Sequence, residues 1–225
     1  MVEIPDSTHG KGRTVKRAPG KSVFVQIIKH FSPLWWTESM STGVISIVLH
    51  PRNFNFPFRG LGIISDIFFI YNVFIFILFT ISFILKIFFS GFKLAFNYGT
   101  NELPVLAAFP VALATIIDMI CLTCVQSWGM HWGYLAYILW WIDVSASLAA
   151  AYGVYYTIFE RKTDLAIIKP TFLLPVIAVL TAAAAGGVVG SFSGLPYHVT
   201  EPVIIVSFML LGLGLGLAFV KFICL

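Results

Sequence analysis

The chain has 225 residues, of which 59% are hydrophobic and only 11% are charged, and its formal net charge at pH 7 is +4. This composition excludes an ordinary soluble domain, in which about 25% of the residues are charged, and is typical of a polytopic membrane protein. Continuous apolar runs of roughly twenty residues favour helices over a transmembrane barrel, so we expect an all-α membrane protein.

The residues before the apolar runs fall into two parts. Residues 1–20 are rich in Gly, Lys and Arg, and we expect a disordered basic tail on the cytoplasmic side. In residues 21–32, apolar side chains recur at helical spacing between polar ones. This pattern indicates either an amphipathic helix on the membrane surface or a lead-in to the first span.

Residues 33–225 form the predicted transmembrane domain. It contains six apolar runs, each long enough to cross the hydrocarbon core if the first is taken as marginal. The runs cover residues 34–49, 61–85, 103–126, 132–158, 170–190 and 202–223. We therefore expect six transmembrane helices, paired as three hairpin repeats.

The Lys and Arg residues are distributed unevenly about these runs. Of the 14, only Arg52 and Arg59 fall on one side of the predicted membrane, and the rest fall on the other. The positive-inside rule therefore places both termini in the cytoplasm. Contact with anionic lipid headgroups accounts for the basic charge, so no nucleic acid is expected as a partner.

The odd-numbered runs differ from the even-numbered runs in composition. They carry Pro33, Pro110 and Pro175 at or near their predicted cytoplasmic starts and are rich in small residues, whereas the even-numbered runs are bulkier. Proline frees backbone carbonyls and small side chains leave room, which favours a path lined by the odd-numbered helices. Close helix packing is the alternative. The N-terminal ends of these three helices all face the cytoplasm, where their partial positive charge attracts anions.

Five stretches, in order along the chain, resemble one family of membrane proteins. They are FSPLWWTESMSTGVISIVLH, FFIYNVFIFILF, FPVALATII, WGYLAYILWWIDVSASL and FLLPVIAVLTAAAAGGVV. This set resembles the tellurite-resistance/dicarboxylate transporter family, also described as voltage-dependent anion channels, and most closely its fungal sulfite-efflux branch. The resemblance covers about Val23 to Ser191.

The resemblance implies helical hairpins with quasi-fivefold symmetry around a central pore, with the odd-numbered helices inside. It also implies efflux of small anions across the plasma membrane, with sulfite favoured and malate or another C4-dicarboxylate as the alternative. The family has ten spans, and the phenylalanine that plugs the pore in relatives lies on the ninth. Because the chain ends at KFICL, directly after the sixth run, we expect a truncated form. Transport should be weak or absent unless the chain forms a homo-oligomer or joins a longer relative.

The candidate path residues are acidic, hydroxylated, small or aromatic residues on the odd-numbered runs. They are Glu38, Ser39, Ser41, Thr42, Gly43, Phe109, Thr115, Asp118, Thr181 and Gly186. Glu38 either faces the path or complements its helix N-terminus, and Asp118, midway along its run, is the better candidate for a pore-facing or protonatable group. The hydroxyls either contact the anion or bond back to their own helix, and Phe109 either narrows the pore or packs.

Three further residues suggest other interpretations. Asp143, on an even-numbered run, is expected to accept hydrogen bonds from a neighbouring helix. Cys121 and Cys124 form a C-x-x-C motif, which raises a membrane thiol oxidoreductase as the rival class. Such enzymes need a second cysteine pair, and the remaining Cys224 is predicted at the opposite face, so we do not expect an enzyme. The histidines fall in loops or at interfaces, so no metal or other cofactor is expected.

Overall fold

The computed structural model describes residues 32–53, 60–90, 103–160 and 173–223, and within these ranges the regular structure is helical. The prediction of an all-α membrane fold is confirmed. The predicted basic tail at 1–20 and nearly all of the predicted interfacial helix at 21–32 lie outside the described residues.

The helices follow the predicted runs in order. The first hairpin is α2 (Trp35–Val48) and α3 (Leu61–Ser90). The second begins with four consecutive helical segments. They are a 3-10 turn (Leu103–Ala107), α5 (Ala108–Met119), a π-helical turn (Ile120–Cys124) and α6 (Val125–Trp128). Its return helix is α7 (Met130–Glu160), and the third hairpin is α8 (Leu174–Phe192) and α9 (Tyr197–Ile223).

Several boundaries differ from the predicted ones, and the first and sixth helices differ in ways that bear on the fold. Among the described residues, five helical segments are long and apolar enough to cross a membrane, and α2, with 14 residues, is not one of them. The run at 34–49 therefore forms a helix that falls short of a full span of about twenty residues. The sixth helix begins at Tyr197 and holds Pro202 inside it. Pro202 removes one intrahelical hydrogen bond near the helix start, a loss that membrane bundles tolerate.

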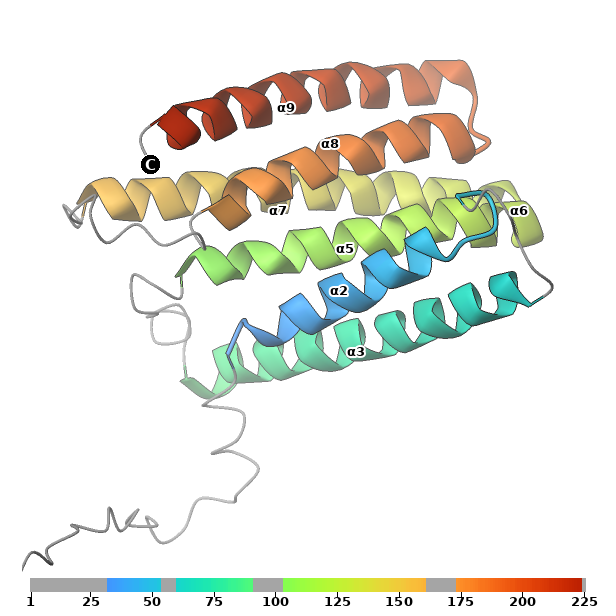
Figure 1. Ribbon diagram of the computed structural model, residues 1–225, viewed down its shortest axis with the longest axis horizontal. Coiled ribbons are helices and arrows are strands. Elements are labelled where there is room, and N and C mark those ends of the chain that lie inside the picture. Colours follow the sequence, from blue (N-terminus) through green and yellow to red (C-terminus); the bar gives the residue numbers. More distant parts are fainter. Residues whose placement is uncertain (1–31, 54–59, 91–102, 161–172, 224–225) are drawn as a thin grey trace, which may run out of the picture.

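Successive membrane helices run in opposite directions. Figure 1 shows α2, α5 and α8 running the same way, while α3, α7 and α9 run back. α5 lies between α2 and α8 and contacts both. In the most apolar stretch of the segment Pro104–Trp128, 83% is buried, whereas in the corresponding stretch of α3 only 11% is buried. The odd-numbered helices of the sequence thus form one layer with α5 at its centre, and the exposed apolar surface of α3 suits lipid.

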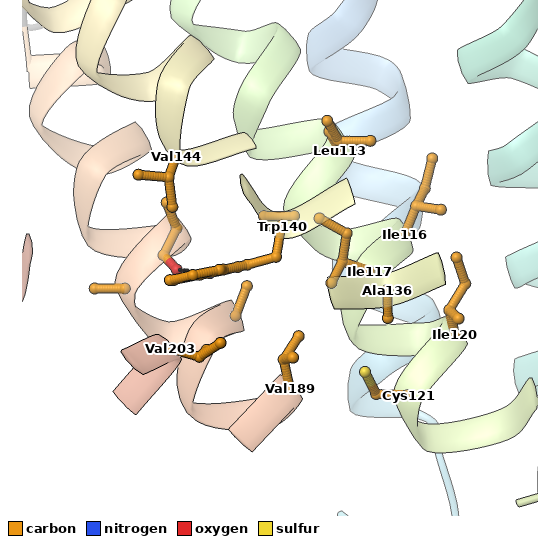
Figure 2. Packing of buried hydrophobic residues seen from close by; sticks show 14 of the residues in the cluster. Leu113, Ile116, Ile117, Ile120, Cys121, Ala136, Trp140, Val144, Val189 and Val203 are labelled. Atoms are coloured by element: carbon orange, nitrogen blue, oxygen red, sulfur yellow. Dashed lines mark hydrogen bonds between the residues drawn. The ribbon is translucent and has the colours of Figure 1, made fainter. Parts of the chain in front are cut away.

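The largest hydrophobic cluster joins α5, α7, α8 and α9 around Trp140. Figure 2 shows Trp140 among Ile117 of α5, Val189 of α8 and Val203 of α9. The indole is fully buried, and its Nε1 donates a 2.9 Å hydrogen bond to the Ala182 carbonyl oxygen. Small residues on α8 permit this close approach, so the alanine-rich stretch of α8 packs against α7 on this side.

Candidate functional site

Asn72 on α3 links two of the predicted path residues, Ser39 and Thr115. Its Oδ1 accepts a hydrogen bond from Ser39 Oγ at 2.7 Å, and its Nδ2 donates to Thr115 Oγ1 at 3.4 Å. All three side chains are buried, so they join α2, α3 and α5. Sequence reasoning missed Asn72, although a lone amide inside a Phe- and Ile-rich run was a signal for a polar contact.

Two of the predicted path glycines lie at helix contacts. A Cβ added to Gly43 would collide with Thr115 Oγ1 and lie 2.7 Å from Asn72 Nδ2. A Cβ on Gly186 would collide with Ser207 Oγ and lie 2.7 Å from the Trp140 ring. Gly43 therefore lets α2 approach α3 and α5, and Gly186 lets α8 approach α7 and α9, as the packing alternative expects.

The remaining predicted hydroxyls donate to carbonyl oxygens of their own helices. The bonds are Ser41 Oγ to Thr37 at 2.7 Å, Thr42 Oγ1 to Glu38 at 2.9 Å and Thr181 Oγ1 to Ala178 at 3.0 Å. A hydroxyl bonded in this way has used its only proton, so it has none left to donate to an anion unless the bond breaks. Ser41 is exposed, Thr181 is half-buried and Thr42 is buried.

Phe109 packs against aromatic side chains of the first hairpin. Its ring centroid lies 5.1 Å from that of Trp36 and 5.4 Å from that of Phe76. It also lines an apolar cavity of about 700 Å³, together with Phe83 of α3 and Ala150 of α7. Phe109 thus lies where α5 meets α2, α3 and α7.

Polar and small residues remain exposed on the outer members of the odd-numbered layer. On α2, Glu38 and Ser41 are exposed along one stripe, one helical turn apart. On α8, Ala184 and Gly187 are exposed, and nothing lies within 4 Å of a Cβ added at Gly187. The flanking helices of this layer therefore each present an uncovered face within the described structure.

Asp118 interrupts the burial of the central helix. In α5, from Ala108 to Met119, every residue is buried except Phe109 and Asp118. The Asp118 Oδ1 atom is itself buried and has no hydrogen-bond partner among the described residues. Of the predicted path residues on α5, Asp118 is thus the one that joins partial exposure to an unused polar atom.

Asp143 on α7 is a buried acid. Its side chain is fully buried, and neither carboxylate oxygen has a hydrogen-bond partner among the described residues. The prediction that Asp143 accepts hydrogen bonds from a neighbouring helix is therefore wrong. Asp118 on α5 lies within electrostatic range of Asp143, and α5 and α7 are in contact.

Cys121 and Cys124 lie in the π-helical turn Ile120–Cys124. Both thiols are buried and free. Over the described ranges, no three His, Cys, Asp or Glu side chains gather where they would hold a metal ion.

A cation–π contact closes the end of the bundle opposite the start of α2. The Arg52 guanidinium, in the turn after α2, lies 5.2 Å from the ring centroid of Phe192 at the end of α8. His50 precedes it in the same turn, and its Nδ1 accepts a 3.4 Å hydrogen bond from the Arg52 N–H. Burial lowers the pKa of His50, and Arg52 lowers it further against the opposing effect of Asp66.

Several known transport proteins are similar to this chain in sequence. The sulfite efflux pump SSU1 of Arthroderma benhamiae is 37% identical over 165 residues, which cover 72% of this chain and 43% of that protein. The sulfite efflux pump SSU1 of Trichophyton rubrum is 36% identical with the same coverage. The malic acid transport protein of Schizosaccharomyces pombe is 26% identical over 192 residues, covering 84% of this chain and 43% of that protein.

The chain thus spans less than half the length of these curated relatives, and no solved structure matches it significantly. The profile of the SLAC1 family, described as voltage-dependent anion channel, matches residues 30–225. That match includes every described helix and both uncovered faces of the odd-numbered layer. The chain belongs to the voltage-dependent anion channel family.

Proposed function

We propose that this chain forms part of a transmembrane path for a small anion, and that α2, α5 and α8 line it. The observation that carries the proposal is the layer of three parallel helices, with the buried α5 between two helices that each keep an uncovered face. Glu38, Ser41, Asp118 and Gly187 place polar groups and open backbone on this layer. Polar side chains at membrane depth are costly unless they meet water or a partner, which favours a hydrated path.

Sulfite is the favoured substrate and a C4-dicarboxylate such as malate is the alternative. Support for sulfite comes from relatives named sulfite efflux pump, at up to 37% identity, and support for malate from one named malic acid transport protein, at 26%. The parallel helices direct their partially positive N-terminal ends to one side, where they attract anions of either kind.

The path is complete only when further helices cover α2 and α8. Glu38 and Ser41 are exposed, and a polar group left in hydrocarbon costs several kcal/mol. Other copies of this chain or a longer relative would supply the cover. We further propose that the protein is a multi-pass protein of the plasma membrane with both termini cytoplasmic, which the excess of Lys and Arg on that side supports.

Flux measurement in a host that lacks its own sulfite and malate transporters tests the proposal. The chain is expressed, its oligomeric size is determined in detergent, and sulfite efflux and radiolabelled malate uptake are compared with those of the empty host. We expect sulfite efflux above background from an assembly larger than one chain. Absence of flux for both anions, with the protein assembled in the membrane, would refute a transport role for the chain.

A further inference from the structure

Three unpartnered polar atoms lie on one face of α7. Asp143 and Ser147 are four residues apart, so they occupy neighbouring positions on the same face of the helix. Both side chains are fully buried. Asp143 Oδ1, Asp143 Oδ2 and Ser147 Oγ have no hydrogen-bond partner among the described residues. Other serines of this bundle bond within the protein, as Ser145 Oγ does to the Trp141 carbonyl oxygen at 2.9 Å.

The elements packed against this face offer no positive charge. Those with the most extensive contacts to α7 are α5, α8, α6 and the short turns Leu103–Ala107 and Ile120–Cys124. None of these segments contains Lys, Arg or His. Their titratable groups are Asp118, Cys121 and Cys124, and Asp118 acts on Asp143 electrostatically. On α7 itself, His131 and Glu160 lie at the two ends, and the remaining titratable groups are tyrosines.

A buried ionised carboxylate in this setting would lack a counter-ion and would face a second carboxylate. Both conditions disfavour the charged form, and a buried acid normally responds by taking up a proton. A neutral carboxylic acid needs one acceptor for its own proton and can accept from a hydroxyl. Ser147, one turn away and free to rotate, can meet either need.

We propose that Asp143 is a proton-binding site within the membrane, completed by Ser147 and Asp118. One proton from water adds to one carboxylate oxygen of Asp143, and the same proton returns to water when the site empties. Because Asp118 and Asp143 repel each other when both are charged, they take up and release protons as a coupled pair. Asp118 is the partly exposed member, so it connects the buried acid to the layer of α2, α5 and α8.

The consequence for transport rests on the proposed function. A negative charge at Asp118 repels an anion in the path, and protonation of the pair removes part of that charge. Anion flux through the assembled protein should therefore increase as the pH falls. The proton site itself depends only on the packing of α5 against α7.

Infrared spectroscopy of the protein in lipid vesicles tests the proton site without any measurement of transport. At neutral pH, the parent should show the C=O stretching band of a protonated carboxylic acid, and Asp143→Asn should lose it. Asp66→Asn, which changes a half-buried acid of α3, should keep the band. Ser147→Ala should shift its frequency, because it removes the hydroxyl proposed to bond the protonated acid. Circular dichroism establishes that each variant is folded, and Asp143→Glu, which should retain a shifted band, serves if Asp143→Asn does not fold.

Equal bands in the parent and in folded Asp143→Asn, or no acid band in the parent, would overturn the proposal. A second measurement addresses the consequence for transport, since sulfite flux in Asp118→Asn should lose the pH dependence that the parent shows. A parent with the acid band but without flux would contradict the transport role and leave the proton site standing. Flux in the parent without the acid band would contradict the proton site and leave the transport role standing.

Discussion

Ser39 Oγ on α2 donates a 2.7 Å hydrogen bond to Asn72 Oδ1 on α3, and both side chains are buried. Replacing Asn72 by Leu leaves the Ser39 hydroxyl without its acceptor in an apolar contact. We expect a loss of about 1–3 kcal/mol in the free energy of unfolding. Thermal unfolding in detergent, followed by tryptophan fluorescence, measures it. Ser82→Ala is the control, because Ser82 on the same helix donates to the Leu78 carbonyl oxygen of that helix. Equal unfolding temperatures in both variants and the parent would show that the contact adds nothing.

Gly43 permits a close approach of α2 to α5. Gly43→Ala places a methyl group against Thr115 and Asn72, so α2 must shift, and we expect destabilisation of about 1–3 kcal/mol. Gly187→Ala, with open space around it, should change stability by less than about 0.5 kcal/mol. Thr115→Ala removes the colliding hydroxyl, so the double variant should lose less than the sum of the single losses. Additive losses in the double variant would contradict the collision.

Trp140 and Trp141 are adjacent in sequence, but Trp140 is fully buried and Trp141 is exposed. Trp140→Ala removes the largest side chain of the cluster and the hydrogen bond to Ala182, and it should cost about 3–5 kcal/mol. Trp140→Phe keeps most of the volume and should cost less. Trp141→Ala should remain within about 1 kcal/mol of the parent. The ranking is measured by denaturant unfolding in mixed micelles, and an equal loss at the two positions would reject the described orientation of α7.

Asp118 should affect anion flux at a fixed neutral pH more than Asp143 does. Asp118→Asn keeps the side-chain size and removes negative charge at the partly exposed position of α5, so anion flux should rise several-fold. Asp143→Asn removes a group proposed to be neutral already, so its flux at that pH should change less. Sulfite flux per assembled protein, compared at equal membrane abundance, measures both. Flux in Asp118→Asn that matches the parent at every pH would reduce Asp118 to a packing residue.

His50 should make stability depend on pH. Because burial lowers the pKa of His50 in the folded chain, the unfolded chain binds the proton more tightly than the folded chain. Stability should therefore fall as the pH decreases below the ordinary histidine value of about 6.5. His50→Gln should remove this part of the pH dependence. Asp66→Asn should enlarge it, because Asp66 raises the pKa of His50. Parallel pH profiles of unfolding temperature for the parent and His50→Gln would contradict the assignment.

The sequence alone determined the class of structure and the division into two kinds of helix. Continuous apolar runs leave the helix as the means of bonding every backbone group within lipid, so the order and type of the elements followed from composition. The small residues and prolines of the odd-numbered runs separated them from the bulky even-numbered runs, and in the structure α2, α5 and α8 run in one direction with α5 in contact with the other two. The family also followed, because its ordered motifs are local in sequence.

The roles of individual side chains depended on the tertiary structure. A glycine or serine in an apolar run looks the same in the sequence whether it faces a path or a neighbouring helix. Gly43 and Gly186 lie at helix contacts because Thr115, Asn72, Trp140 and Ser207 come from other helices, and their positions are set by how those helices cross. The local sequence around Asp143 does not reveal whether its carboxylate has hydrogen-bond partners on other helices. The packing of α5 and α8 against α7 decided that the Asp143 carboxylate is buried without a hydrogen-bond partner among the described residues. Burial and pairing depend on several segments together, so the local sequence does not reveal them.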